Sequence, residues 1–418
     1  MMRSNQAKYE SFVLRIAFLF AGQFALYEGF QDWNRGRADV NPVVAVATLS
    51  IYAVSLLMIA LALTSNATVF RFRDLPLLPL VLATIVSLYV VAEIAYHGSY
   101  RTDVLAFSHY AAILVTRGLN PYTQDMTPAL SMFAVQPSDL TPLTTGSFLV
   151  PAPFQYPALQ FLVFVPFVAA GLRDMRWVLL VFELAIIAVL YIKCPKNLRP
   201  ILILPLFAGS DLMINYTAAS VSDIIWVLPI VLTAFTIDRK LVLSGIFYGI
   251  ACATKQPPWL LAPFLMIYLI RETGPRETYL KRIAAFFVPA LGVFALANLP
   301  FAYSDPGGWL RDILTPILSN LVSLSQGGPA VLSEVGLIHV QPVFYSLLAV
   351  GVLIVLVANY FVYYSRLKFV MWIFPGIVLW FSYRALTSYI IYWMPLMLVS
   401  LILWYRSTES TQFRGRRN

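Results

Sequence analysis

Asp103 is the residue of this sequence best placed for acid–base chemistry. It follows a long apolar run, residues 75–96, and directly precedes residues 104–115, whose apolar side chains recur at helical spacing. A carboxylate in this position can take the proton from a hydroxyl group as that group attacks a carbon atom. The alternative is that Asp103 caps the helix, since Asp is favoured just before a helix begins. The two roles conflict, because a carboxylate that accepts bonds from backbone amides has a lowered pKa and is a weaker base.

Three basic residues could stabilise a departing anion. Lys255 ends a short apolar run just before Gln256, Arg384 stands between two apolar runs, and Arg117 shares a loop with Asp103. Arginine can bind a phosphate group through two parallel hydrogen bonds, whereas lysine acts as a point charge. The alternative for Lys255 and Arg384 is that each side chain anchors the end of a helix at a membrane interface.

Further polar and aromatic residues lie in or beside the predicted loops. Asp211 and Asp223 flank a predicted turn, where each is either functional or the cap of a neighbouring helix. His109 and His339 have no second metal ligand at a suitable spacing, so we expect neither a divalent metal nor any other cofactor. The candidates for contact with a substrate are Tyr122, Asp125, Asp211, Asp223, Trp309, His339 and Tyr389.

The elements that position these residues are membrane helices. The chain has 418 residues, of which 60% are hydrophobic and only 12% charged, so a soluble globular protein is excluded. We predict one integral domain over residues 1–418. The net charge of +9 comes from short basic clusters between apolar runs, which is typical of cytoplasmic loops and not of a nucleic-acid-binding surface. Cys194 and Cys252 are too few for a disulfide framework or a cysteine metal site.

We predict an all-α bundle of about 12 transmembrane helices, with a range of 11–13. Both termini are expected in the cytoplasm, with extracytoplasmic loops at residues 97–155 and 303–341. Surface helices are expected at residues 104–115 and 309–324. Parity requires that one run does not cross, and residues 156–171 are the weakest because Pro157 and Pro166 interrupt them. The remaining runs are residues 12–30, 43–63, 75–96, 177–192, 200–216, 224–237, 241–253, 259–270, 283–303, 342–364, 369–383 and 389–405.

Short motifs spread over most of the chain resemble the type C glycosyltransferases, and within them glycosyltransferase family 87. These are integral membrane enzymes that use polyprenyl-phosphate sugars. The matching residues are Asp103, Tyr110-Ala111-Ala112, Gly118-Leu119-Asn120-Pro121-Tyr122, Gln155-Tyr156-Pro157, Pro166, Ala253-Thr254-Lys255-Gln256-Pro257, Leu299-Pro300-Phe301 with Trp309, and Arg384 followed by Tyr389.

The resemblance implies transfer of a hexose such as mannose from a polyprenyl-phosphate carrier to an extracytoplasmic lipid, glycan or protein acceptor, with inversion. In this interpretation Asp103 is the base, while Lys255, Arg384 and Arg117 hold the donor phosphate. Tyr122 and Trp309 are the best candidates for stacking on a sugar. No glycine-rich phosphate loop follows a predicted strand, which argues against a nucleotide-sugar domain.

Two other classes remain open. A transporter, or a lipid or polysaccharide flippase, explains the composition equally well, but it does not explain a long loop that carries an acid followed by a helix. A polysaccharide ligase or polymerase of another membrane fold is the second alternative.

Overall fold

The computed structural model describes residues 15–16, 18–27, 29–31, 34, 41–64, 77–136, 140, 142–145, 148–151, 153–199, 210–274, 278–318 and 328–415. Most of these residues are helical, as predicted. The chain separates into two compact units. The first comprises Met1–Gly98, Arg176–Ala219 and Leu401–Asn418, and the second comprises Ser99–Met175 and Ser220–Ser400. The single domain expected from the sequence stays a prediction.

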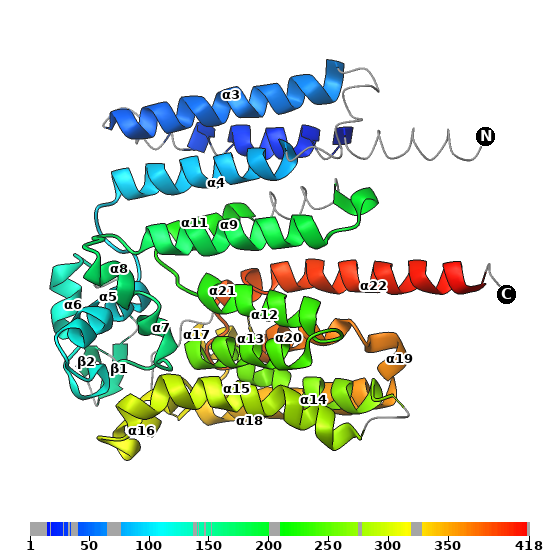
Figure 1. Cartoon of the computed structure of the whole chain (residues 1–418). Helices are drawn as coiled ribbons and strands as arrows, with labels where there is room; N and C mark the ends of the chain where they lie inside the picture. Colours follow the sequence, from blue (N-terminus) through cyan, green and yellow to red (C-terminus); the bar gives the residue numbers. More distant parts are fainter. Residues whose placement is uncertain are drawn as a thin grey trace. The chain divides into compact units, whose positions relative to one another are not determined.

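The first unit is built from long helices. α3 packs along α4, and α4 packs along α9 and α11 (Figure 1). Small side chains of α3 and α4, Val44, Ala47 and Ala92, form part of the buried core. Glu93 and Glu183 are buried inside this unit, as expected for acids within apolar helices. Its elements are α3 (Pro42–Thr64), α4 (Leu77–Tyr96), α9 (Arg176–Lys193), η4 (Lys196–Leu198) and α11 (Ser210–Ala218).

The second unit contains the loop that was predicted at residues 97–155. This segment is largely ordered into α5 (Asp103–Thr116), η2 (Pro121–Thr123), α6 (Thr127–Met132) and a hairpin of β1 (Pro142–Thr145) and β2 (Phe148–Pro151). The strands are antiparallel, with Pro142 opposite Pro151. α5 ends just before Gly118, which adopts a left-handed conformation with φ +74°.

The rest of the second unit consists of helices of varied length. α13 lies between α12 and α15 and carries Lys255 at its C-terminal end (Figure 1). The elements are α7 (Leu159–Leu162), α8 (Val165–Ala169), α12 (Ile224–Thr236), α13 (Leu241–Thr254), η5 (Pro257–Leu261), α14 (Ala262–Arg271), α15 (Tyr279–Ala302), α16 (Pro306–Leu318), α17 (Val331–Glu334), α18 (Pro342–Val362), α19 (Tyr364–Leu367), η6 (Val370–Trp372), α20 (Phe374–Trp380), α21 (Thr387–Ile391) and α22 (Met394–Gly415), the last shared with the first unit.

Within the described ranges, four helical stretches are long and apolar enough to cross a membrane. They are Pro42–Leu63, Tyr279–Ala302, Pro342–Val362 and Thr387–Thr408. The protein is therefore a membrane protein. The other apolar helices are shorter. α12 and α13, for example, have 13 and 14 residues, or about 20 Å at 1.5 Å per residue, against a hydrocarbon core of about 30 Å. The predicted count of about 12 crossings stays a prediction.

The run at residues 156–171 is not one continuous helix. It forms α7 and α8, which have four and five residues and meet at Val163 and Phe164. Neither piece is long enough to cross a membrane alone. The choice of this run as the one that does not cross stays a prediction. The predicted helix at residues 309–324 is present as α16 up to Leu318, and residues 319–324 lie outside the described part.

Candidate functional site

Asp103 is the first residue of α5 and is buried, with 4% of its surface exposed. The N-cap position belongs to Thr102, so the capping alternative does not describe Asp103. The Thr102 hydroxyl donates to the backbone carbonyl of Ser220 at 2.7 Å, which anchors the start of the helix to another segment. The partial positive charge of a helix N-terminus favours the ionised form of a carboxylate in the first turn.

α5 is a helix as predicted, but its polar residues do not form an exposed face. Ser108 and His109 are buried, because α5 packs against α6, α7 and α8. The His109 Nδ1 lies 2.9 Å from the Tyr100 hydroxyl, and its ring stacks on Phe133. Burial lowers the pKa of His109 from 6.5 to about 4. The predicted helix is confirmed, and tertiary partners cover the side that carries Ser108 and His109. Its position along the membrane surface stays a prediction.

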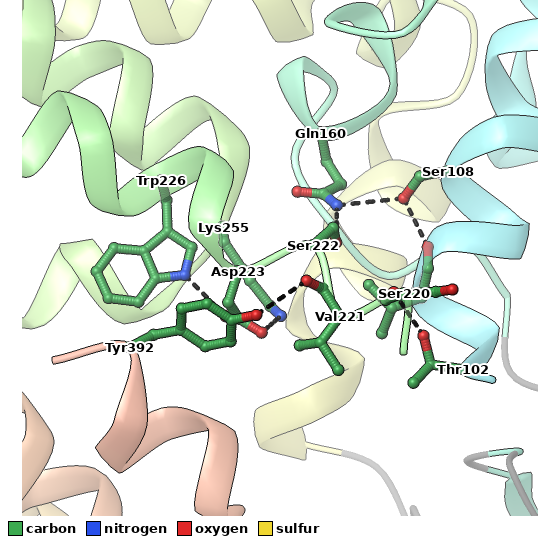
Figure 2. A network of polar contacts seen from close by, with 11 residues as sticks. Thr102, Ser108, Gln160, Ser220, Val221, Ser222, Asp223, Trp226, Lys255 and Tyr392 are labelled. Carbon is green, nitrogen blue, oxygen red and sulfur yellow. Dashed lines mark hydrogen bonds and ion pairs between the residues drawn. The ribbon is translucent and has the colours of Figure 1, made fainter. Parts of the chain in front are cut away.

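The turn at residues 220–223 connects four segments of the second unit (Figure 2). The Ser220 carbonyl accepts from Thr102, and the Val221 carbonyl accepts from the Tyr392 hydroxyl at 3.2 Å. The Ser222 hydroxyl accepts from the Gln160 amide. Ser220 has φ +82°, which is uncommon outside glycine and is held by these contacts. The turn predicted between Asp211 and Asp223 is helical as far as Ala218, so only its last residues form a turn. No local pattern marks its serines as part of a site.

The hydrogen bonds around Gln160 determine how its amide is oriented. The Ser108 hydroxyl donates to the Val104 carbonyl at 2.7 Å, so it accepts from Gln160 Nε2 at 3.2 Å. The amide oxygen of Gln160 consequently points away from Ser108 (Figure 2). Among the described residues, this oxygen, the Gln155 amide oxygen and the Ser220 hydroxyl are buried and have no hydrogen-bond partner. Such groups can accept hydrogen bonds from hydroxyl groups of a ligand.

Asp223 and Lys255 form a buried ion pair. Lys255 Nζ lies 2.8 Å from Asp223 Oδ2, and the side chains are 5% and 2% exposed. The other carboxylate oxygen, Oδ1, accepts from Trp226 Nε1 at 2.7 Å. Asp223 occupies the N-cap position of α12 but makes no side-chain capping bond. The capping alternative proposed for Asp223 therefore does not hold, because its two oxygens bind Trp226 and Lys255 instead.

Tyr156 lies where these segments meet. Lys255 Nζ is 5.0 Å from the centre of the Tyr156 ring and 6.0 Å from that of Tyr389. Burial raises the pKa of the Tyr156 phenol well above its usual range. The charges of Asp103, Tyr389 and Asp223 raise it further, and Arg384 lowers it. We call these residues the Tyr156 site, which consists of Asp103, Tyr156, Asp223, Lys255, Arg384 and Tyr389.

The Tyr156 site thus unites residues from distant parts of the sequence. Asp103 begins α5, Lys255 ends α13, Arg384 lies between α20 and α21, and Tyr389 lies in α21. Arg384 and Tyr389 are partly exposed, whereas Asp103, Asp223 and Lys255 are buried. The arrangement contains two acids and two cations, and Asp223 is paired directly with Lys255.

Tyr122 positions the loop that carries Tyr156. Its hydroxyl donates to the Tyr156 carbonyl at 2.7 Å, and its ring packs against Phe154, Phe161 and Phe301. These contacts give Tyr122 a packing role, and its stacking on a sugar stays a prediction. Asn120 supports the same loop, since its amide donates to Phe301 O and Ser304 Oγ, both at 2.9 Å.

α16 contributes a buried acid that the sequence did not single out. Asp312 is 5% exposed, and burial raises its pKa to about 6. Gln256 ties α16 to the site, because its amide donates to the Gln155 and Ile313 carbonyls, each at 2.8 Å. Trp309 is half-buried in the same helix. The sequence alone does not show which face of α16 is buried, so it could not mark Asp312 as a buried acid.

Three predicted residues, Arg117, Asp125 and His339, are exposed and are not among the residues of the Tyr156 site. Arg117 is exposed at the C-terminal end of α5, about 20 Å from Asp103 at 1.5 Å per residue. Asp125 is exposed and accepts from the backbone and hydroxyl of Thr127 at 2.9 and 2.7 Å, so it stabilises a local turn. His339 is exposed between α17 and α18. Asp211 belongs to α11 of the first unit, and its side chain lies outside the described part.

In the part of the chain that the structure describes, no group of three His, Cys, Asp or Glu side chains could hold a metal ion. Comparison with protein-family models, curated proteins and solved structures finds no match for this chain. The resemblance to type C glycosyltransferases therefore rests on the short motifs alone.

Proposed function

We propose that this membrane protein is a glycosyltransferase that moves a hexose, such as mannose, from a polyprenyl-phosphate carrier to an acceptor hydroxyl on the extracytoplasmic side. The observation that carries the proposal is the Tyr156 site. There an acid at a helix N-terminus and a partly exposed arginine lie within electrostatic reach of the same phenol. Acid and cation are the two groups that this transfer needs.

In the proposed reaction Asp103 accepts the proton of the acceptor hydroxyl. The acceptor oxygen forms a bond to the anomeric carbon, and the bond from that carbon to the phosphate oxygen breaks. The leaving polyprenyl phosphate keeps the electron pair, and Arg384 stabilises its charge. Attack from the face opposite the leaving group inverts the anomeric carbon, as the family resemblance implies.

The donor is a lipid monophosphate sugar in this proposal. A lipid-linked donor reaches the site from the membrane, and its monophosphate has little charge to neutralise, so one arginine can serve. The buried acceptor groups of Gln155, Gln160 and Ser220 suit a ligand rich in hydroxyl groups. The acceptor can be a lipid, a glycan or a protein.

The test is a transfer assay with purified protein. We expect polyprenyl-phosphate mannose or polyprenyl-phosphate glucose to support transfer in the presence of EDTA. We expect Arg384→Ala to weaken donor use more than acceptor binding. Arg173→Ala is the control, because Arg173 is exposed and has no place in the site. Transfer from a nucleotide sugar in the absence of any polyprenyl phosphate would contradict the proposal.

A further inference from the structure

The buried pair of Asp223 and Lys255 occupies a central place in the Tyr156 site, and the charge of each residue already has a partner there. Lys255 is 4% exposed and Asp223 is 1% exposed. A phosphate ligand would have to reach an ammonium group that a carboxylate at 2.8 Å and two tyrosine rings already surround. The charge of Lys255 is balanced within the protein, so a donor phosphate gains little from it.

The contacts of the pair indicate what it does instead. Asp223 fixes the start of α12 through Trp226, and Lys255 fixes the end of α13. The Lys255 ammonium then lies against Tyr156, which precedes α7, and Tyr389 of α21. An ammonium group near the faces of aromatic rings is attracted to them, and the attraction is stronger when water is excluded. One pair thereby holds four segments that meet at the site.

We infer that Asp223 and Lys255 are positioning residues, which act as a charge-neutral pair to place Tyr156 and Tyr389, and that Arg384 receives the donor phosphate. The inference rests on the proposed function, because the placement of Tyr156 and Tyr389 affects turnover only if the protein catalyses the transfer reaction. It differs from the sequence prediction, in which Lys255 itself binds the phosphate and Asp223 contacts the substrate.

The pair makes a specific prediction about charge balance. Removing one partner leaves the other charge buried without compensation, which is far more costly than removing both. We therefore expect Asp223→Asn and Lys255→Met each to lower kcat by about thirtyfold or more. The double variant Asp223→Asn/Lys255→Met should return to within about fivefold of the natural protein. The KM for the donor should change little in the double variant.

The experiment combines transfer kinetics with thermal unfolding of each purified variant. A binding assay with polyprenyl phosphate alone gives a readout that does not require turnover. We expect the double variant to bind polyprenyl phosphate within about threefold of the natural protein, whereas Arg384→Ala should lose about tenfold or more. Loss of polyprenyl phosphate binding in Lys255→Met that Asp223→Asn does not rescue would overturn the inference, because it would make Lys255 a phosphate ligand.

A second ion pair in the same unit provides a matched control. Lys368 Nζ and Glu272 Oε2 lie 2.6 Å apart, and their side chains are 25% and 29% exposed. The single variants Glu272→Gln and Lys368→Met and the double variant should alter thermal unfolding without changing kcat of the folded protein. If the Asp223 and Lys255 variants behaved in this same way, the pair would be purely structural and the inference wrong.

Failure of the proposed function would look different. In that case the natural protein would transfer no sugar from any polyprenyl-phosphate donor. Thermal unfolding would still show whether Asp223 and Lys255 are coupled, since the double variant would be more stable than either single variant. If the double variant were less stable than both, the description of the two residues as a neutral pair would be wrong, whatever the function.

Discussion

The role that we propose for Asp103 depends on the surroundings of this single residue. It is buried at the start of α5, while the cap position belongs to Thr102. A buried carboxylate interacts strongly with nearby charges, because little water is present to screen them. Asp103, Asp223 and Arg384 all act on the phenol of Tyr156.

The first prediction at this scale concerns the proposed base. Asp103→Asn should leave thermal unfolding nearly unchanged and lower turnover by roughly a hundredfold or more, because an amide keeps the shape but cannot accept the acceptor proton. Purified protein and a lipid-linked sugar suffice for the measurement. Asp125→Asn is the control, since Asp125 is exposed and serves a local turn. Natural activity in Asp103→Asn would remove Asp103 from the mechanism.

Asp312 offers a direct comparison of two buried acids. Its pKa is raised to about 6 by burial, so it is partly protonated near pH 6. If Asp312 were the base, Asp312→Asn would abolish turnover and Asp103→Asn would not. We expect the reverse, because Asp103, and not Asp312, is among the charges that act on the Tyr156 phenol.

The second prediction concerns the pH dependence of stability. His109 has a pKa of about 4 in the folded protein against 6.5 for the free group, so it stays neutral when folded but takes up a proton when unfolded below pH 6.5. Stability should thus fall as pH drops from 6.5 to 4, by on the order of 3 kcal/mol, and be independent of His109 above pH 6.5.

Thermal unfolding across this pH range tests the assignment to His109. The substitution His109→Asn also removes packing against Phe133, which lowers stability at every pH, so the quantity to compare is the slope of stability against pH. We expect a shallower slope between pH 4 and 6.5 in His109→Asn. His339→Asn should keep the natural slope, because His339 is exposed. Equal slopes for the natural protein and His109→Asn would disprove the assignment.

At the scale of elements, the approach of α13 to α15 decides where Lys255 lies. Gly245 and Gly249, four residues apart on α13, face the backbone of α15. A Cβ atom at Gly245 would collide with the Phe286 carbonyl oxygen, and one at Gly249 would lie 2.5 Å from that of Ala290. Small residues at this spacing are what permits close helix packing in membranes.

The third prediction is that Gly249→Ala forces α13 away from α15 and lowers stability by about 1–3 kcal/mol, as overpacking does. Because Lys255 ends α13, activity should fall as well. Gly292→Ala on α15 is the matched control, since no atom lies within 4 Å of the position that the alanine methyl group would take. Thermal unfolding of both variants checks the prediction, and equal effects of the two substitutions would contradict it.

The end of α5 illustrates a different local requirement. Gly118 has φ +74°, and the space around it is open, so only the backbone conformation demands glycine there. The Asn120 side chain then accepts from the Tyr122 amide at 3.1 Å, which starts η2. The glycine, asparagine, proline and tyrosine of residues 118–122 thus form one turn that holds Tyr156 in place through Tyr122.

At the scale of the whole molecule, the question is which side of the membrane each loop faces. The described part of the chain contains four helices able to cross. The basic clusters of the sequence predict that both termini and residues 271–282 lie in the cytoplasm and residues 97–153 outside. This orientation puts Asp103 on the extracytoplasmic side, where the proposed donor and acceptor meet.

The fourth prediction tests this orientation by cysteine labelling in intact cells, with Cys194 and Cys252 replaced by alanine. A cysteine at Gln136, which is exposed, should react with a membrane-impermeant thiol reagent. A cysteine at Arg276, which lies outside the described residues, should be protected until the membrane is opened. The opposite pattern would invert the topology and place Asp103 in the cytoplasm.

The sequence by itself determined the helices, because apolar periodicity, proline and glycine act over a few residues. Residues 43–63, 283–303 and 342–364 coincide with α3, α15 and α18 to within a few residues. The break at residues 156–171 also followed from local chemistry, since Pro166 removes a backbone donor. Asp103 became the candidate base in the same way, because it is an acid that directly precedes apolar residues at helical spacing.

Only the tertiary structure decided which charges pair and which side chains are covered. Nothing local distinguishes Lys255 from Arg384, yet packing buries Lys255 against Asp223 and leaves part of Arg384 exposed to solvent. Likewise, Ser108 and His109 look like a polar surface until α6, α7 and α8 cover them. The physical reason is that burial and ion pairing depend on segments far apart in sequence, whose meeting no local pattern records.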